Sequence, residues 1–218
     1  YGLIEGVDKW LNNRKRQAIL KKSDAITAAD FERIMDVRPR IEKIAVKDIK
    51  LRTFITEDRS RDDLVAHVYD VTYGIIRRGK DNLVVIDDSI VRGTTLKESI
   101  IRILDRLDPA KIVIVSSSPQ IRYPDCYGID MAKLGDFIAF RAAVELLKET
   151  GRGEVIRKVH SKALEELKKT DAEMVNVVKE IYVPFSDNEI SRQIAVMLKT
   201  PEIKADLEIV FQSVEGLH

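Results

Sequence analysis

Apolar residues in the middle of the chain alternate between strand-like runs and a helix-like stripe. Residues 82–86 and 111–115 are largely apolar runs of strand length, which is typical of strands buried on both faces of a sheet. Between them, apolar side chains recur at helical spacing, at Leu96, Ile100, Ile103, Leu104 and Leu107. A strand, a loop, a helix and a second strand form a βαβ unit. The sequence therefore predicts a parallel sheet with a right-handed crossover.

Helical spacing also extends over both ends of the chain. It predicts helices over residues 4–20, 28–35, 137–150, 154–168 and 186–198.

Two pairs of residues have the spacing of capping boxes, which mark helix starts. Thr95 with Glu98 is the first pair, and Ser186 with Glu189 is the second. We expect a helix to begin at each pair.

The stretch before the first long apolar run is less regular. It predicts a short strand over residues 43–46 and a helix over residues 63–76. Residues 47–61 are expected to form an exposed excursion, because their clustered charges cannot enter a core. Residues 207–211 predict a final strand.

These elements predict an α/β fold, with a parallel sheet flanked by helices and extra helices at both ends. Residues 1–40 would form a helical N-terminal segment or insertion. Residues 41–150 would form the core, and residues 151–218 a C-terminal helical extension with a final strand. The Gly151-Arg152-Gly153 sequence is the natural boundary between the last two segments.

Composition narrows the classes of function. Apolar residues make up 44% of the chain and charged residues 33%, which suits a packed core with a well-solvated surface. The 37 basic and 36 acidic residues give a net charge of +1, so neither nucleic acid nor a membrane surface is expected as a partner. The single cysteine, Cys126, cannot form an internal disulfide. With no signal peptide or transmembrane run visible, we expect a cytoplasmic protein.

The loop after the first long strand carries the candidate chemistry. Asp87 and Asp88 follow the strand, at the edge where α/β folds bind ligands. Hydroxyl groups, a glycine and an arginine follow before the helix, and such a helix start attracts anions. One end of the loop therefore suits a phosphate, and the other suits ribose hydroxyls or hydrated Mg²⁺. Two aspartates after a strand fit a solvated strand end equally well.

The complete loop string resembles a family signature. IDDSIVRGTT, residues 86–95, is similar to the 5-phosphoribosyl-1-pyrophosphate (PRPP) signature of type I phosphoribosyltransferases. Followed by SSSPQIRYPDCYGIDM, residues 116–131, it resembles glutamine amidophosphoribosyltransferases in particular. Residues 52–55, preceded by Lys47, resemble the flexible loop of that family. The glycine spacings of P-loops and dinucleotide-binding folds are missing.

This resemblance implies a type I phosphoribosyltransferase-like sheet and a role for each matching residue. Asp87 and Asp88 would bind the ribose hydroxyls and Mg²⁺, while Lys47 and Arg52 would act in catalysis from the flexible loop. The PRPP 5-phosphate would be held by the following residues: Ser89, Ile90, Val91, Arg92, Gly93, Thr94 and Thr95. The implied reaction belongs to de novo purine synthesis: ammonia displaces pyrophosphate and forms 5-phosphoribosylamine.

The sequence also departs from the family pattern. Cys126 is internal, so ammonia would come from a glutaminase domain absent from this chain, and one cysteine cannot hold an iron–sulfur cluster. The family's pyrophosphate loop is not found before Lys43. We therefore expect a C-terminal fragment that is incomplete for catalysis. A homo-oligomer is a separate expectation. A PRPP-binding regulator without turnover and a nucleobase phosphoribosyltransferase remain alternatives.

Overall fold

The computed structural model describes most of the chain. The described residues are 2–22, 26–41, 74–124, 133–170 and 172–217, together with the backbone of 45–47 and 69–71. They form two compact units, Tyr1–Ile44 and Ala45–His218.

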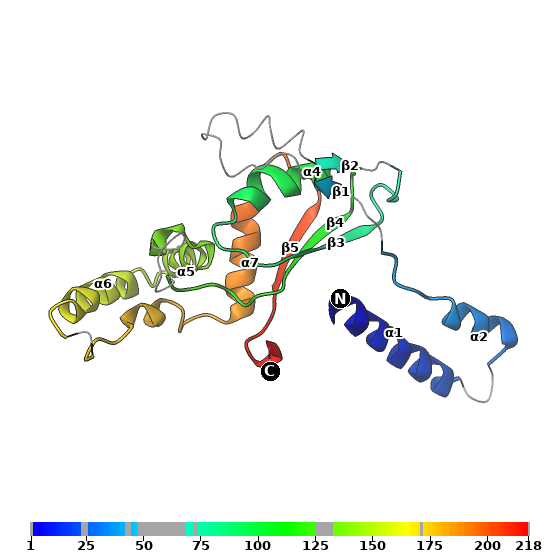
Figure 1. Cartoon of the computed structure of the whole chain (residues 1–218), viewed down its shortest axis with the longest axis horizontal. Coiled ribbons are helices and arrows are strands. Elements are labelled where there is room, and N and C mark those ends of the chain that lie inside the picture. The colour runs from blue at the N-terminus through cyan, green and yellow to red at the C-terminus, as the bar shows by residue number, and fades with distance from the viewer. Residues whose placement is uncertain are drawn as a thin grey trace. The chain divides into compact units, whose positions relative to one another are not determined.

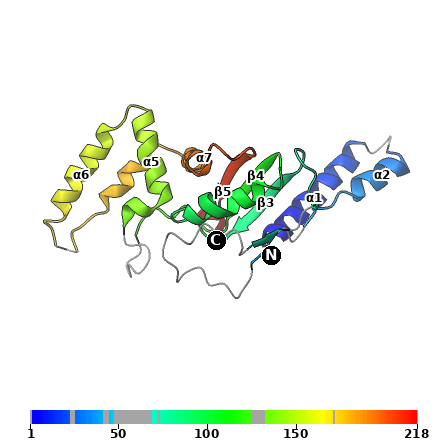
Figure 2. The same cartoon turned by 90° about the horizontal axis from the view of Figure 1, so that it is seen from above.

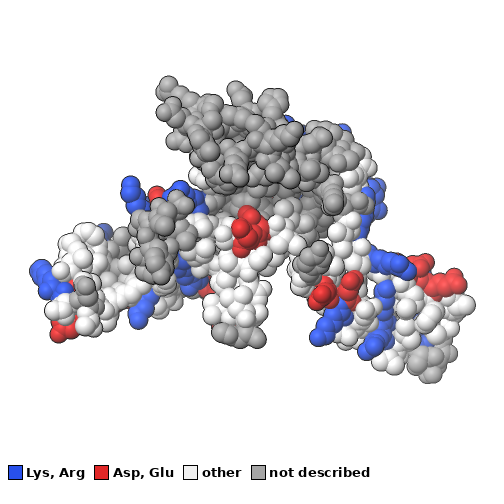
Figure 3. Space-filling model, in the orientation of Figure 1, with Lys and Arg blue, Asp and Glu red and all other residues white. Residues whose placement is uncertain are grey.

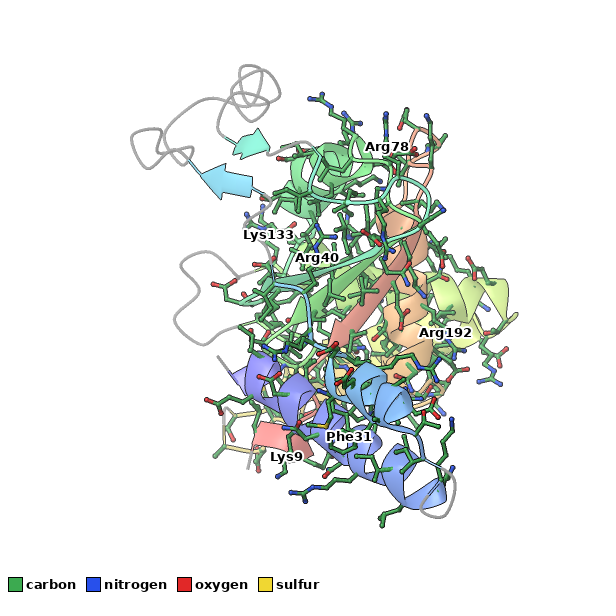
Figure 4. All side chains as sticks on the ribbon, turned by 90° about the vertical axis from the view of Figure 1, so that its right-hand side faces the viewer. Lys9, Phe31, Arg40, Arg78, Lys133 and Arg192 are labelled. Carbon is green, nitrogen blue, oxygen red and sulfur yellow. The ribbon has the colours of Figure 1, made fainter. Side chains whose placement is uncertain are left out.

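The first unit is a pair of helices, α1 (Gly2–Lys21) and α2 (Ala28–Met35). The side chain of Thr27 caps α2 by accepting a hydrogen bond of 3.1 Å from the Asp30 N–H. Lys15 Nζ of α1 donates to the carbonyl oxygen of Met35 at 2.7 Å and so links the two helices. Neither helix contains a buried residue, and Figure 4 labels one side chain on each, Lys9 on α1 and Phe31 on α2. Both helices predicted for this part of the chain are confirmed.

The second unit is built on a three-stranded parallel sheet. Its strands are β3 (Asn82–Asp87), β4 (Lys111–Ser116) and β5 (Asp206–Phe211), in that order (Figure 1). The register places Asp87 beside Ser116 and Ser116 beside Phe211, so all three strands end at one edge. The predicted strands and their parallel pairing are confirmed. The final strand belongs to this sheet.

Helices fill both connections between the strands. A π-helical stretch, Leu96–Ile100, continues into α4 (Ile101–Asp105) between β3 and β4. The longer connection between β4 and β5 contains α5 (Ile138–Glu149), α6 (Glu154–Glu166) and α7 (Asp187–Leu198). Helix α7 packs along β5, and α5 packs on α7 on the side away from the sheet (Figure 2). These elements confirm the predicted α/β fold.

Short 3₁₀ turns complete the second unit. They are Leu134–Asp136, Val177–Ile181 and Glu215–Leu217.

One face of the sheet is covered and forms the core. Its side chains are all less than 9% exposed: Leu83, Ile112, Ile114, Leu207 and Ile209. They meet the buried sides of α4 and α7, where Ile101, Ile194 and Leu198 are at most 1% exposed. Burial of this apolar area is the main force that holds the helices on the sheet.

The opposite face of the sheet is partly exposed, whereas the sequence predicted strands buried on both faces. Val84 is 58% exposed and Ile86 is 51% exposed, and Val210 of β5 is 39% exposed. Successive side chains of a strand point to opposite faces, and the described residues place both connecting helices on the other face. For β3, burial on both faces is therefore wrong in the described part of the chain.

The region before β3 also differs from the prediction. Residues 69–71 form strand β2 (Tyr69–Val71), which pairs antiparallel with β1 (Ala45–Lys47). The turn that follows contains Gly74 with φ of 84°. The predicted helix over residues 63–76 is thus wrong where the chain is described, because strand pairing and a left-handed glycine prevail there. The predicted short strand appears as β1.

The two predicted capping boxes have different outcomes. Ser186 and Glu189 form a complete capping box at the start of α7, as predicted. Thr95 makes no capping hydrogen bond, because the chain is already helical at Thr94. The Lys97 N–H donates to the carbonyl oxygen of Gly93 at 3.0 Å, so the first helical turn starts earlier than predicted.

Charged residues of both signs are interspersed over the described surface visible in Figure 3. This distribution agrees with the net charge of +1 for the whole chain. An example is Arg78, before β3, whose Nε lies 3.6 Å from Asp108 Oδ2 (Figure 4). Among the described helices, none has both the length and the apolar character needed to cross a membrane.

Candidate functional site

The candidate site is the loop that leaves the carboxyl end of β3. It begins at Asp87, the last residue of the strand, and ends at Gly93, before the first helical turn. The side chain of Ile90 is 2% exposed and anchors the middle of the loop in the core. Asp88, Arg92 and the neighbouring threonines are exposed. The loop thus has a fixed inner side and an open outer side.

Two adjacent carboxylates occupy the start of the loop. The Asp88 N–H donates to Asp87 Oδ1 at 3.0 Å, and the Ser89 N–H donates to Asp88 Oδ1 at 2.6 Å. Burial raises the pKa of Asp87 above its ordinary value. The hydrogen bond from Asp88 acts in the opposite direction, and the negative charge of Asp88 raises the pKa further. A bound cation would offset both the cost of burying the negative charge of Asp87 and its repulsion from Asp88.

The end of β4 holds this first half of the loop through its backbone. The N–H and the Oγ of Ser117 both donate to the carbonyl oxygen of Asp87 at 2.9 Å. The Ser118 N–H donates to the carbonyl oxygen of Asp88 at 3.1 Å. Sequence reasoning did not predict these serines as site residues. The available signal was a run of serines directly after the neighbouring parallel strand.

The start of α5 holds the second half of the loop. The Ile138 N–H donates to the carbonyl oxygen of Val91 at 2.8 Å. Arg141 Nη2 donates to the carbonyl oxygen of Arg92 at 3.0 Å. The guanidinium group of Arg92 itself lies 3.8 Å from a carboxylate oxygen of Asp136. Three residues around the start of α5 therefore fix two consecutive peptide groups and one side chain of the loop.

Gly93 is required by both its backbone and its surroundings. Its φ is +74°, a left-handed conformation that favours glycine. A Cβ at this position would lie 2.6 Å from Ile138 Cδ1 and 2.9 Å from Leu198 Cδ2. The loop consequently packs directly against the ends of α5 and α7.

Comparison with known proteins finds relatives of one name for a part of the chain. No protein-family model matches the chain. A segment of 68 residues is 43% identical to an amidophosphoribosyltransferase of Haemophilus influenzae and covers 31% of this chain and 13% of that protein. This segment is homologous to amidophosphoribosyltransferases.

Amidophosphoribosyltransferases from distant organisms give the same result. The protein of that name from Escherichia coli is 40% identical over 68 residues, 31% of this chain and 13% of that protein. The one from Saccharomyces cerevisiae is 39% identical over 72 residues, 33% of this chain and 14% of that protein. The matches thus span about a seventh of the length of these relatives.

The predicted site residues differ in how the structure places them. The loop and the first helical residues after it bring together Asp87, Asp88, Ser89, Ile90, Val91, Arg92, Gly93, Thr94 and Thr95. Lys47 is the last residue of β1, and only its backbone is described. Arg52 and Cys126 lie outside the described residues.

The described part of the site suits a phosphorylated sugar with a hydrated cation. Mg²⁺ is commonly held by one or two carboxylates, with water and substrate phosphates as its other ligands. Asp87 and Asp88 provide two such carboxylates. Within the described residues, no group of three or more histidine, cysteine, aspartate or glutamate side chains could hold a metal ion. The two carboxylates could serve as ligands of a hydrated Mg²⁺.

Proposed function

We propose that this chain supplies part of the phosphoribosyl-transferring half of an amidophosphoribosyltransferase, acting in purine synthesis. In that reaction ammonia attacks C1 of PRPP, the C1–oxygen bond to pyrophosphate breaks, and 5-phosphoribosylamine forms. The observation that carries the proposal is the loop 87–95. It combines two carboxylates with an anion-binding turn in a chain that has a segment homologous to enzymes of this name.

The second half of the loop would bind the 5-phosphate of PRPP. Gly93 has no side chain that would keep a phosphate away from the backbone. The hydroxyls of Thr94 and Thr95 are exposed and offer further hydrogen-bond donors. The partial positive charge of a helix start favours an anion at the same place.

The first half of the loop would bind the ribose and its Mg²⁺. The carboxylates of Asp87 and Asp88 accept hydrogen bonds from ribose hydroxyls and provide hard oxygen ligands for the cation. The serines at the end of β4 hold the backbone of both aspartates, which would limit the movement of the carboxylates before a ligand arrives. Positioning of this kind lowers the entropic cost of binding.

The remaining parts of the reaction would come from elsewhere. Mg²⁺, when bound, neutralises negative charge on the departing pyrophosphate. Lys47 and Arg52 would add positive charge from the flexible loop and help to exclude water. Ammonia would be delivered by a glutaminase domain outside this chain. We expect the complete enzyme to be a homo-oligomer and the chain to be incomplete for turnover by itself.

Isothermal titration calorimetry of the 218-residue chain with PRPP tests this function. We expect binding that requires Mg²⁺ and is lost in an Asp87→Asn, Asp88→Asn variant. A Glu154→Gln, Glu165→Gln variant is the matched control, because it removes two exposed carboxylates from α6. It should bind like the unmodified chain.

Three outcomes separate the proposed function from a nucleobase phosphoribosyltransferase. Failure of the folded chain to bind either PRPP or ribose 5-phosphate would contradict the proposal. Mg²⁺-dependent binding followed by slow release of pyrophosphate with ammonia would support the transferase. Binding with pyrophosphate release only in the presence of a purine base would instead favour a nucleobase phosphoribosyltransferase.

A further inference from the structure

The candidate phosphate loop is held mainly by its carbonyl groups. Partners outside the loop bind the carbonyl oxygens of Asp87, Asp88, Val91, Arg92 and Gly93. All of these partners are backbone N–H groups except the Ser117 hydroxyl and the guanidinium group of Arg141. The hydroxyl adds to a bond that the Ser117 N–H already makes. Arg141 is thus the side chain whose removal would release a loop carbonyl in the described structure.

Peptide geometry links that carbonyl to the N–H of the next residue. A peptide group is planar and trans, so its C=O and N–H bonds point in opposite directions. The carbonyl of Arg92 points to Arg141 on α5, at 3.0 Å. The N–H of Gly93, in the same peptide group, therefore points away from α5. Among the described residues, no oxygen accepts a hydrogen bond from this N–H.

We propose that Arg141 is a positioning residue that aims the Gly93 N–H at the 5-phosphate of the substrate. This inference rests on the function proposed above and adds a residue outside the loop to the site. Because Gly93 has no Cβ, this peptide group is less restricted in its rotation than its neighbours are. The hydrogen bond from Arg141 restricts that rotation, and a fixed donor binds an anion at a lower entropic cost.

Arg141 lies outside the core, so its role at the loop can be tested without disturbing the fold. The residue is exposed, whereas the core contacts of α5 come from neighbours that are at most 1% exposed, including Phe137, Ile138 and Leu147. Replacing Arg141 therefore removes one hydrogen bond and leaves the apolar packing of α5 in place. We expect the variants to fold.

The test compares Arg141→Met with Arg141→Lys and with Arg157→Met in the complete chain. Methionine keeps much of the apolar stem and removes the donor, whereas lysine keeps a charged donor. Arg157 is an exposed arginine of α6 and controls for the loss of one positive charge. The probe is ribose 5-phosphate, with affinity measured by calorimetry and the Gly93 amide resonance followed by ¹⁵N NMR.

We expect Arg141→Met to weaken binding of ribose 5-phosphate about fivefold, the effect of one ordinary hydrogen bond. The Gly93 amide resonance of the free protein should move in the same variant. Arg141→Lys should recover most of the affinity, and Arg157→Met should match the unmodified chain. Unchanged affinity in Arg141→Met would overturn the inference. So would weaker binding with an unmoved Gly93 resonance, because the effect would then be one of charge alone.

The same measurements separate this inference from the proposed function. If the unmodified chain does not bind ribose 5-phosphate, the proposed function fails. The Gly93 resonance of free Arg141→Met still reports whether Arg141 orients the peptide group. A resonance that does not move overturns the positioning role whatever the ligand result.

Discussion

Two neighbouring loops leave the same edge of the sheet, and they are stabilised in different ways. The loop after β3, residues 88–93, is held by hydrogen bonds to its backbone carbonyls, and most of its polar side chains remain on the surface. The loop after β4, residues 117–124, is held in its second half by its side chains. The first arrangement leaves functional groups available for a ligand, and the second uses them for structure.

The side chains of the β4 loop form a network with α7 and the turn before it. Gln120 Nε2 donates to the carbonyl oxygen of Asp187 at 2.7 Å, and Arg122 Nη2 donates to Gln120 Oε1 at 2.7 Å. Arg122 also forms an ion pair with Asp187 and lies 4.9 Å from the ring centroid of Tyr182. The Tyr182 hydroxyl donates to the carbonyl oxygen of Arg122 at 2.8 Å. Burial raises the pKa of Tyr182, so this donor stays protonated.

The two loops would therefore have different roles at the edge of the sheet. The β4 loop would act as a rigid support, while the β3 loop would bind the ligand. Changes in the second half of the β4 loop, which contains Gln120 and Arg122, should therefore affect stability without a direct effect on binding. In the β3 loop, a change to the backbone should affect both stability and binding. A change to an exposed side chain should affect mainly binding.

The largest effect is expected for Gly93→Ala, which changes the backbone of the β3 loop. A left-handed alanine costs about 1–2 kcal/mol, and contacts below 3.0 Å with Ile138 and Leu198 add overpacking of about 1–3 kcal/mol. Urea denaturation should show a loss of about 2–5 kcal/mol in the free energy of unfolding, together with weaker ligand binding. A Gly79→Ala variant is the matched control. Gly79 also has positive φ, at 65°, but nothing lies within 4 Å of its Cβ position. Equal losses in both variants would refute the packing contribution.

A smaller effect is expected for Arg122→Met, which breaks the side-chain network of the β4 loop. The change removes hydrogen bonds to Gln120 and the ion pair with Asp187, and the methionine keeps an apolar contact with the ring of Tyr182. We expect thermal denaturation to show a loss of about 1–2 kcal/mol. Affinity for ribose 5-phosphate should stay unchanged when measured well below the melting temperature. A loss of affinity larger than about threefold would show that the side chains of the β4 loop also contribute to binding.

The smallest effect on stability is expected for Asp87→Asn, and it should depend on pH. The folded protein raises the pKa of Asp87 above the ordinary value of 3.8. Ionisation of this carboxyl therefore costs stability as the pH rises from the ordinary pKa through the raised pKa of the folded protein. Asparagine removes the cost, so the variant should gain less than about 0.5 kcal/mol at pH 7. It should gain nothing at a pH below the ordinary value. Urea denaturation at pH 7 and pH 3 checks the sign, and destabilisation at pH 7 alone would contradict the expected direction.

Periodicity predicted the regular elements of this chain well. The strands β3, β4 and β5 and the helices α2 and α7 lie where their apolar patterns placed them. These elements depend on local spacing, which the sequence displays directly. The place of Asp87 and Asp88 could be predicted in the same way, because residues that follow a parallel strand lie at the carboxyl edge of the sheet.

Other features depend on contacts that no local pattern contains. The hydrogen bond from Arg141 to Arg92 joins residues 49 positions apart, and the bond from Ser117 to Asp87 joins residues 30 positions apart. The capping role predicted for Thr95 was wrong because Gly93 allows the helical turn to start earlier. The exposure of Val84 was missed because an apolar run does not reveal which face is covered. The roles of Lys47 and Arg52 remain predictions.

The open face of the sheet has a practical consequence for work with the isolated chain. Val84 and Ile86 form part of an apolar surface on β3, an edge strand of the sheet in the described part of the chain, and this combination promotes aggregation in concentrated samples. Threonine at position 84 would keep the branched shape that strands favour while adding a hydroxyl group. Because Val84 and Asp87 point to opposite faces of β3, solubility can be improved there without altering the carboxylates.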